Sequence, residues 1–244
     1  MDDWQYKPAR DQALTPAETL RSLQRESGLA FATTQMMWRM AVYAYLKTYH
    51  RLRVIGGENI PAKPPFVMIA NHASHLDALV LGAALPWQLR RKAFPIAAGD
   101  VFFETPQASL FSAMTLNALP MWRKHCGPHA LQELRERLIN EPAIYLLFPE
   151  GQRSRDGTMG PFKPGLGMMI AGSDVPVVPC YLDGTFAACP PGTKWPRPWP
   201  LKLTVGPPVT FPGVVNRRAG WDEIATTLQT AVQALRTPST VAES

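Results

Sequence analysis

Two short apolar runs, each followed at once by a polar turn, constrain the fold of this chain more than any other feature. Phe66–Ala70 leads into Asn71-His72, and Ala143–Phe148 leads into Pro149-Glu150. A short run that is apolar on both faces is typical of a strand buried within a sheet. Proteins of the α/β class place their ligands at the carboxyl ends of such strands. Both polar turns are therefore candidate functional sites.

Further strands and helices alternate along the chain, which predicts an α/β fold. We expect a central mixed, mostly buried β-sheet flanked by helices, with a helical segment at the N-terminus. Additional strands are expected at Leu52–Ile55, Val175–Leu182 and, as an edge strand, Leu201–Val205. Helices are expected at Thr15–Glu26, Ala30–Tyr49, Glu104–Arg123 and Trp221–Leu235, and around Leu131–Leu138, where Glu133 and Arg137 can pair.

The length and apolar content predict one large domain that follows a helical segment. The chain has 244 residues, of which 46% are hydrophobic and 18% charged, so we expect a buried core and exclude disorder. Residues 1–50 are expected to form a helical segment that can associate with a membrane, and residues 51–244 a single catalytic domain. The three scattered cysteines include no C-x-x-C pair, which excludes a zinc ribbon and a thioredoxin-type redox site.

The positive charge of the chain is concentrated in stretches without acidic residues. The formal net charge is +6, and twelve of the 25 lysines and arginines lie in Ser27–Gly57, Ala78–Gly99 and Gly184–Trp221. Tryptophan and tyrosine residues are interleaved with them, a composition typical of proteins at anionic membrane surfaces. A nucleic acid would accept the same composition, and scattered solvated arginines would also explain it.

One segment has the length of a membrane span but not its composition. Ser27–Leu46 contains Arg39 and several polar residues, which a spanning helix tolerates poorly. We therefore expect this helix to lie on a membrane or dip into it. The predicted location is the cytoplasmic face of a membrane, with peripheral or monotopic attachment, an anionic membrane surface as partner and no nucleic acid.

The turn after Phe66–Ala70 contains the residues of a general base. Ser74 is suited to cap a new helix, which would place Asp77 in the first helical turn, where it can fold back toward His72. A carboxylate on one imidazole nitrogen fixes the tautomer and makes the other nitrogen a better base. The pattern therefore predicts that His72 abstracts a proton from a hydroxyl group and that Asp77 orients it.

Three alternatives use the same residues. Ser74, His75 and Asp77 are the residue types of a hydrolase triad, but adjacent side chains on a helix point apart. His72 and His75 form an H-x-x-H pair, but a catalytic zinc site needs a third ligand, so no metal is expected. A structural His72, hydrogen-bonded inside the core, would also fit this motif taken alone.

The second turn, Glu150–Ser154, has the composition of an anion site. Gly151 allows the backbone to approach a ligand closely. Arg153 offers a planar fork of donors that suits a phosphate, and Ser154 can add a hydroxyl contact. An arginine in a turn is usually just solvated, but two polar turns at strand ends in one chain favour a shared function.

The two turns resemble sequence blocks of the glycerolipid acyltransferase family. Asn71–Asp77 fits the N-H-x-x-x-x-D (HX4D) block, and Phe148–Ser154 is similar to the F-P-E-G-x-R-S block, with Gln152 where threonine is usual. The remaining blocks are matched by Leu119–Arg123, Phe162–Gly165 and Val175–Pro179. The order and spacing match across about Leu52–Phe211, and the branch of most similar size and pattern is the 1-acylglycerol-3-phosphate acyltransferases.

This resemblance implies an enzyme of phospholipid biosynthesis. A fatty acyl group would pass from acyl-CoA or acyl carrier protein to the free hydroxyl of a lysophospholipid, without any cofactor other than this co-substrate. The implied catalytic residues are His72 and Asp77, with an amide of the following turn as oxyanion donor. The implied substrate-binding residues are Asn71, Arg123, Glu150, Gly151, Arg153, Ser154 and Lys163, of which Arg123 and Arg153 would hold the acceptor phosphate.

Other functions stay open at the level of sequence. The acceptor could be a non-phosphate lipid or a specialised hydroxylated molecule, since some positions of the Leu119–Arg123 block depart from the family pattern. A non-catalytic lipid-binding or membrane-binding module on the same fold is another alternative. The apolar stretches Ala78–Leu89 and Thr105–Leu119 are candidate walls of an acyl-chain groove, and core packing would explain them equally well.

Overall fold

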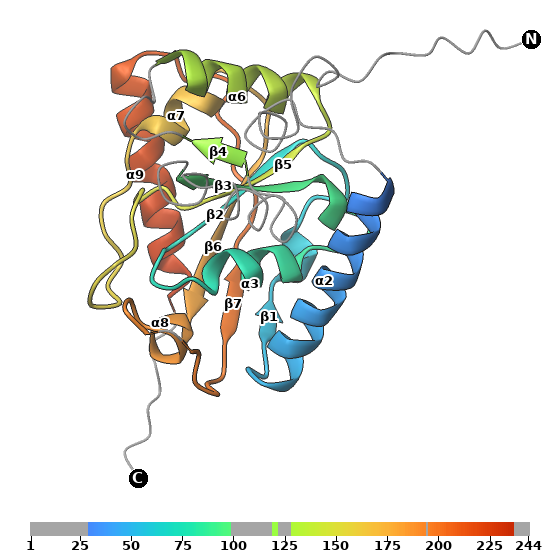
Figure 1. Cartoon of the computed structure of the whole chain (residues 1–244). Coiled ribbons are helices and arrows are strands. Elements are labelled where there is room, and N and C mark those ends of the chain that lie inside the picture. Colours follow the sequence, from blue (N-terminus) through green and yellow to red (C-terminus); the bar gives the residue numbers. More distant parts are fainter. Residues whose placement is uncertain (1–28, 99–118, 122–127, 194, 237–244) are drawn as a thin grey trace, which may run out of the picture.

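The structure is a computed structural model that describes residues 29–98, 119–121, 128–193 and 195–236. Within them a seven-stranded sheet has the order β1-β7-β6-β2-β5-β3-β4, with helices on both of its faces (Figure 1). The strands are β1 Arg53–Ile55, β2 Phe66–Ala70, β3 Ala93–Ala98, β4 Leu119–Met121, β5 Ile144–Leu147, β6 Val177–Asp183 and β7 Lys202–Val205. The helices are α2 Leu29–Thr48, α3 Asp77–Ala84, α6 Pro128–Asn140, α7 Gly165–Ile170, α8 Thr185–Ala188 and α9 Arg218–Ala234.

The sheet is mixed, which confirms the predicted α/β class. Strands β1–β7, β6–β2, β2–β5, β5–β3 and β3–β4 pair in parallel, and only β6–β7 among the pairs described is antiparallel. The chain therefore resembles an α/β protein in which crossover helices cover the sheet.

Strand β2 lies at the centre of the sheet because both of its faces are apolar. Phe66, Met68 and Ala70 belong to one core, which α2 and α3 cover. Val67 and Ile69 point to the opposite face and belong to a second core, which α6, α7 and α9 cover. All five residues are fully buried, as expected for a strand with a helix layer on each side.

The register of the central strands brings the two polar turns together. Ile69 of β2 lies opposite Leu147 of β5, and Ala70 lies opposite Cys180 of β6. The turns that follow β2 and β5 therefore start at the same edge of the sheet.

Several local predictions were wrong. Strand β7 is internal, because the short strand β1 pairs on its outer side. Arg137 pairs with Glu141 rather than with Glu133. Leu119–Met121 is a strand rather than the end of a helix. Strand β3 was not anticipated, because its Ala93-Phe94-Pro95 start lacks the β-branched residues typical of strands.

The other predicted elements fall into two groups. Helices α2, α6 and α9 occupy the segments expected from sequence, within a few residues at each end. The helix expected at Thr15–Glu26, and most of Glu104–Arg123, lie outside the described residues. No helix in the described part of the chain combines the length and the apolarity that a membrane crossing requires.

Candidate active site

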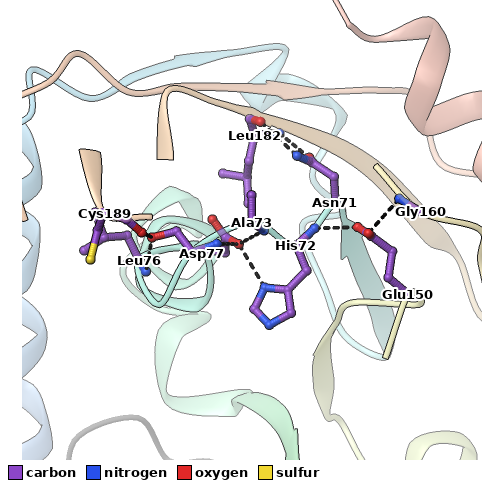
Figure 2. Close-up of polar contacts among 10 residues, drawn as sticks. Asn71, His72, Ala73, Leu76, Asp77, Glu150, Gly160, Leu182 and Cys189 are labelled. Carbon is purple, nitrogen blue, oxygen red and sulfur yellow. Dashed lines mark hydrogen bonds and ion pairs between the residues drawn. The ribbon is translucent and has the colours of Figure 1, made fainter. Parts of the chain in front are cut away.

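His72 and Asp77 form a hydrogen-bonded pair at the carboxyl end of β2. The distance from His72 Nδ1 to Asp77 Oδ2 is 2.9 Å, and Figure 2 shows the imidazole ring pointing toward the carboxylate. Because a carboxylate only accepts hydrogen bonds, Nδ1 carries the proton in the neutral ring, and Nε2 is left with its lone pair. This is the tautomer that a general base requires.

The turn between β2 and α3 is shaped by Asp77 rather than by a serine cap. Asp77 Oδ2 also accepts hydrogen bonds from the amides of Ala73, at 2.7 Å, and Ser74, at 2.8 Å. The Ser74 hydroxyl instead donates to the carbonyl of Cys189 and accepts from the amide of Leu76. The carboxylate is fully buried, and these bonds to its charged form offset the cost of that burial.

The His72 ring is held in place and still reaches solvent. It stacks on Phe148, with the ring centroids 4.2 Å apart and the ring planes inclined by 15°. About a fifth of the side chain, 22%, remains exposed, whereas Asp77 is not exposed at all. Phe148 directly follows the last residue of β5, so the end of this strand positions one face of the imidazole.

Glu150 joins the two turns through their backbones. Its Oε1 accepts from the His72 amide at 2.6 Å, and its Oε2 accepts from the Gly160 amide at 2.8 Å (Figure 2). Burial raises the pKa of Glu150 above its ordinary value, while the two amide hydrogen bonds favour the carboxylate and oppose that rise. The amide of Ser154 also donates to the His72 carbonyl, at 2.7 Å.

Asn71 links the carboxyl end of β2 to β6, the strand that pairs with β2 on the side opposite β5. Its amide nitrogen donates to the Leu182 carbonyl at 3.0 Å, and its oxygen accepts from the Leu182 amide at 2.7 Å. The side chain therefore replaces a missing rung of the β2–β6 ladder. In this structure Asn71 holds the strand ends together and is buried.

Two cationic side chains, those of Arg153 and Lys163, lie at the second turn. Gly151 has φ +72°, a backbone conformation that favours glycine, and an added Cβ would lie 2.8 Å from Lys163 Nζ, at the flexible end of that side chain. Arg153 is half-buried, and its Nη1 has no hydrogen-bond partner among the described residues. Burial and the nearby Arg153 charge both lower the pKa of His75, which places that arginine close to the β2–α3 turn.

Two of the expected site features are arranged differently in the structure, and the third involves a residue that lies outside the described residues. Ser154 Oγ donates to Asp156 at 2.9 Å and is engaged within its own loop. The Ala73 and Ser74 amides already donate to Asp77, so they are not the open oxyanion donors expected from the sequence. Arg123 lies outside the described residues.

The described residues include no cluster of three or more His, Cys, Asp or Glu side chains that could hold a metal ion. Sequence reasoning missed Phe148 as a support for the imidazole, as well as Gly160 and Leu182. A signal for Phe148 was available, since it ends an apolar strand directly before the second turn. Gly160 and Leu182 take part only through their backbones, so their residue types carried no signal.

Residues 51–183 match the sequence profile of the family described as Acyltransferase. The chain is 30% identical over 159 residues to 1-acyl-sn-glycerol-3-phosphate acyltransferase BAT2, chloroplastic, of Brassica napus, which covers 64% of this chain and 42% of that protein. It is also 30% identical over 135 residues to 1-acyl-sn-glycerol-3-phosphate acyltransferase alpha of Homo sapiens, covering 54% of this chain and 46% of that protein. The chain thus spans about half the length of the curated relatives it matches.

A solved structure has the same fold. The 1-acyl-sn-glycerophosphate (LPA) acyltransferase PlsC from Thermotoga maritima superposes with a TM-score of 0.64 at 23% sequence identity, over 84% of this chain and 78% of that one. The family match covers more than half of the 244 residues and includes both polar turns at the edge of the sheet. The chain therefore belongs to the acyltransferase family.

Proposed function

We propose that the protein transfers a fatty acyl group from a thioester to the free hydroxyl of 1-acylglycerol-3-phosphate, forming phosphatidic acid. The observation that carries the proposal is the 2.9 Å bond between His72 Nδ1 and the buried Asp77 carboxylate, which leaves Nε2 available as a base. The names of the relatives in Brassica napus and Homo sapiens support the acceptor. The acyl donor is acyl-CoA or acyl carrier protein.

In the proposed reaction His72 acts first as a base and then as an acid. Nε2 takes the proton of the acceptor hydroxyl as its oxygen attacks the thioester carbonyl carbon, and the carbonyl electrons move to oxygen. When the tetrahedral intermediate collapses, the carbon–sulfur bond breaks and the thiolate receives the proton from the imidazolium. The products are the new ester and a free thiol, so the reaction requires neither a metal nor a covalent acyl-enzyme.

The second turn is the proposed binding site for the acceptor phosphate. Arg153 carries a donor nitrogen that has no partner among the residues the structure describes, and Lys163 Nζ lies near Gly151 of the same turn. Both belong to a loop that is tied to the His72 backbone through Glu150 and Ser154. A phosphate held there would bring a hydroxyl of the same small molecule toward the imidazole, which is the positioning that acyl transfer needs.

Arg153→Ala is expected to raise KM for the phosphate acceptor by about 10- to 100-fold, because a hydrogen bond to a charged group is lost. Arg153→Lys should recover only part of this, since a point charge does not replace the planar fork. The measurement is initial rate against acceptor concentration at saturating acyl-CoA. Arg155→Ala, an exposed arginine two residues away, is the matched control and should leave KM unchanged. A larger effect on KM for the donor would show that the two substrate sites are reversed.

An acyl-transfer assay across acceptors separates the proposal from its alternatives. Purified protein would be given a radiolabelled long-chain acyl-CoA, or the acyl carrier protein thioester, with 1-acylglycerol-3-phosphate or with an analogue that lacks the phosphate. Preference for the phosphate acceptor supports the proposal. Preference for the analogue would favour a non-phosphate acceptor, and a lack of transfer from either donor to either acceptor would favour a binding module.

We also propose peripheral attachment to an anionic membrane, because the substrate is a lipid. Trp195 is 81% exposed and Trp199 48%, and both lie in a loop with Arg197 that has no acidic residue. Exposed methionines, Met36, Met37 and Met40, lie along α2. Trp38 is partly buried instead and faces the neighbouring helix. Basic residues beside exposed aromatic ones suit the lipid headgroup region.

The protein is expected to pellet with anionic vesicles at low salt and to be released as salt rises, since the attraction of exposed charges is screened. The measurement is sedimentation with vesicles of phosphatidylcholine alone or mixed with phosphatidylglycerol. Substituting both Trp195 and Trp199 with serine should reduce the binding that persists at high salt. A protein that stays in the supernatant with anionic vesicles at low salt would contradict this attachment.

A further inference from the structure

A cavity lies beside the loop that follows the second polar turn, on the face of the sheet that α9 covers. Its volume is about 300 Å³, which is enough for part of a small molecule. It is lined by three residues of that loop, one residue of β6 and two at the end of α9, namely Gly157, Thr158, Met159, Tyr181, Gln233 and Arg236. None of these residues takes part in the chemical steps proposed above.

Tyr181 brings this cavity close to the active site. Its strand, β6, pairs directly with β2, whose carboxyl end carries the first polar turn. Burial raises the pKa of Tyr181, the charge of Arg236 opposes this rise, and the carboxylate of Glu150 adds to it. Tyr181 therefore lies near Glu150, whose Oε1 accepts from the His72 amide. The cavity and the turn that holds the imidazole are neighbours across the edge of the sheet.

The cavity offers polar groups that nothing in the described part of the chain binds. The Tyr181 hydroxyl is partly buried and the Arg236 guanidinium is exposed, and neither makes a hydrogen bond or an ion pair with a described residue. Gln233 adds an exposed carboxamide. A carboxylate that also acts on Tyr181, that of Asp183, is paired with Lys202 at 3.5 Å. The cavity thus has a neutral donor inside and a cation at its rim.

Resting on the proposed acyl transfer, we propose that this cavity binds the phosphopantetheine arm of the acyl donor, with the phosphate of the arm against Arg236. The arm joins a phosphate to two amides through short apolar segments. The Tyr181 hydroxyl and the Gln233 carboxamide can bind the amides, and Met159 supplies apolar contact. The thioester at the other end of the arm would then lie toward the edge of the sheet where His72 is found. Acyl-CoA and acyl carrier protein share this arm, so one site serves either donor.

The position of the cavity suits the different solubilities of the two substrates. Helix α9 and helix α2 lie on opposite faces of the sheet (Figure 1). The exposed methionines proposed to contact the membrane are on α2, whereas both kinds of thioester donor are water-soluble. A donor site on the α9 face would be open to solvent while α2 rests on the lipid. Gln233 and Arg236 also lie outside residues 51–183, which match the family profile.

Binding of the arm can be measured by calorimetry with the full chain and without any acyl group, so the result does not depend on turnover. Phosphopantetheine should bind more tightly than pantetheine, which lacks the phosphate. Arg236→Gln should weaken phosphopantetheine binding about 5- to 10-fold, a modest loss because this arginine is exposed, and should leave pantetheine binding unchanged. Arg217→Gln, at the opposite end of α9, is the matched control and should bind both like the wild type. Equal phosphopantetheine binding by the wild type and Arg236→Gln would overturn the proposal.

Two further titrations identify the source of the arm. Coenzyme A is compared with adenosine bisphosphate, its nucleotide without the arm, and holo-acyl carrier protein is compared with the apo form. Tighter binding of the partner that carries the arm, lost in Arg236→Gln, supports the proposal and names that partner as the donor. If the arm increases affinity in neither pair, the cavity does not recognise it and the proposal is overturned.

Steady-state kinetics separate this site from the acceptor site. Tyr181→Phe keeps the ring and its packing but removes the hydroxyl, and should raise KM for the acyl donor about 2- to 10-fold while KM for the acceptor stays unchanged. Arg153→Ala should do the reverse. An equal rise in both KM values for Tyr181→Phe would overturn the assignment. Phosphopantetheine binding that depends on Arg236, without acyl transfer to any acceptor, would refute the proposed reaction and leave this site standing, so the two proposals can fail separately.

Discussion

His72→Ala is expected to lower kcat by about 10²- to 10⁴-fold, the usual contribution of a general base. The substitution removes the imidazole whose Nε2 would take the hydroxyl proton. The backbone contacts of the residue persist, because Glu150 binds its amide and Ser154 donates to its carbonyl. The loss of stacking on Phe148 affects a side chain at the edge of the core, so the fold should remain.

The measurement is single-turnover or steady-state acyl transfer, with the folded fraction of each variant determined by circular dichroism. His75→Ala is the matched control, because it removes an exposed imidazole three residues further on that does not bond Asp77. That control should retain most of the wild-type kcat. A His72→Ala enzyme with near-normal rates at an equal folded fraction would refute the proposed mechanism.

Asp77→Asn is expected to reduce kcat by up to about 10⁴-fold, the loss seen when a carboxylate that orients a catalytic histidine becomes an amide. Asp77 Oδ2 accepts from His72 Nδ1 and from the amides of Ala73 and Ser74. Because one oxygen accepts all three bonds, the asparagine oxygen in its place can still hold the imidazole ring, but it carries no negative charge to stabilise the imidazolium that forms when Nε2 takes the proton.

The same substitution should also lower the thermal unfolding midpoint, because two backbone amides lose a charged acceptor in a buried turn. Asp174→Asn, which changes an exposed aspartate, is the control for the loss of one negative charge. The two readouts together identify the role of Asp77. A drop in stability with kcat unchanged would mean that the carboxylate only shapes the turn and does not assist His72 in the reaction.

The parts of the fold that could be predicted are those with a strong apolar pattern. Strands β2 and β5 are apolar on both faces, and α9 repeats apolar residues at helical spacing, so burial and sequence agree. Strand β1 has only three residues, and two of them are exposed. It forms because β7 offers an open edge, which no local pattern indicates. The wrong prediction of β7 as an edge strand has the same cause.

The hydrogen-bonded pair of His72 and Asp77 could be predicted because it is local. His72 and Asp77 are five residues apart in one strand–turn–helix unit, so backbone geometry alone decides that they meet. The same holds for Gly151, whose positive φ belongs to its own turn. The substrate-binding role of Arg153 stays a prediction, although its turn is hydrogen-bonded to the His72 backbone through the Ser154 amide.

By itself the sequence determined the α/β class, the two central strands and the contact between His72 and Asp77, since each depends on local patterns. Only the tertiary structure decided what joins them. The Glu150 carboxylate spans 78 residues to reach the His72 amide, and Asn71 spans 111 residues to reach Leu182. Such contacts are set by strand order and helix packing, which depend on the burial of the whole apolar surface rather than on any local pattern.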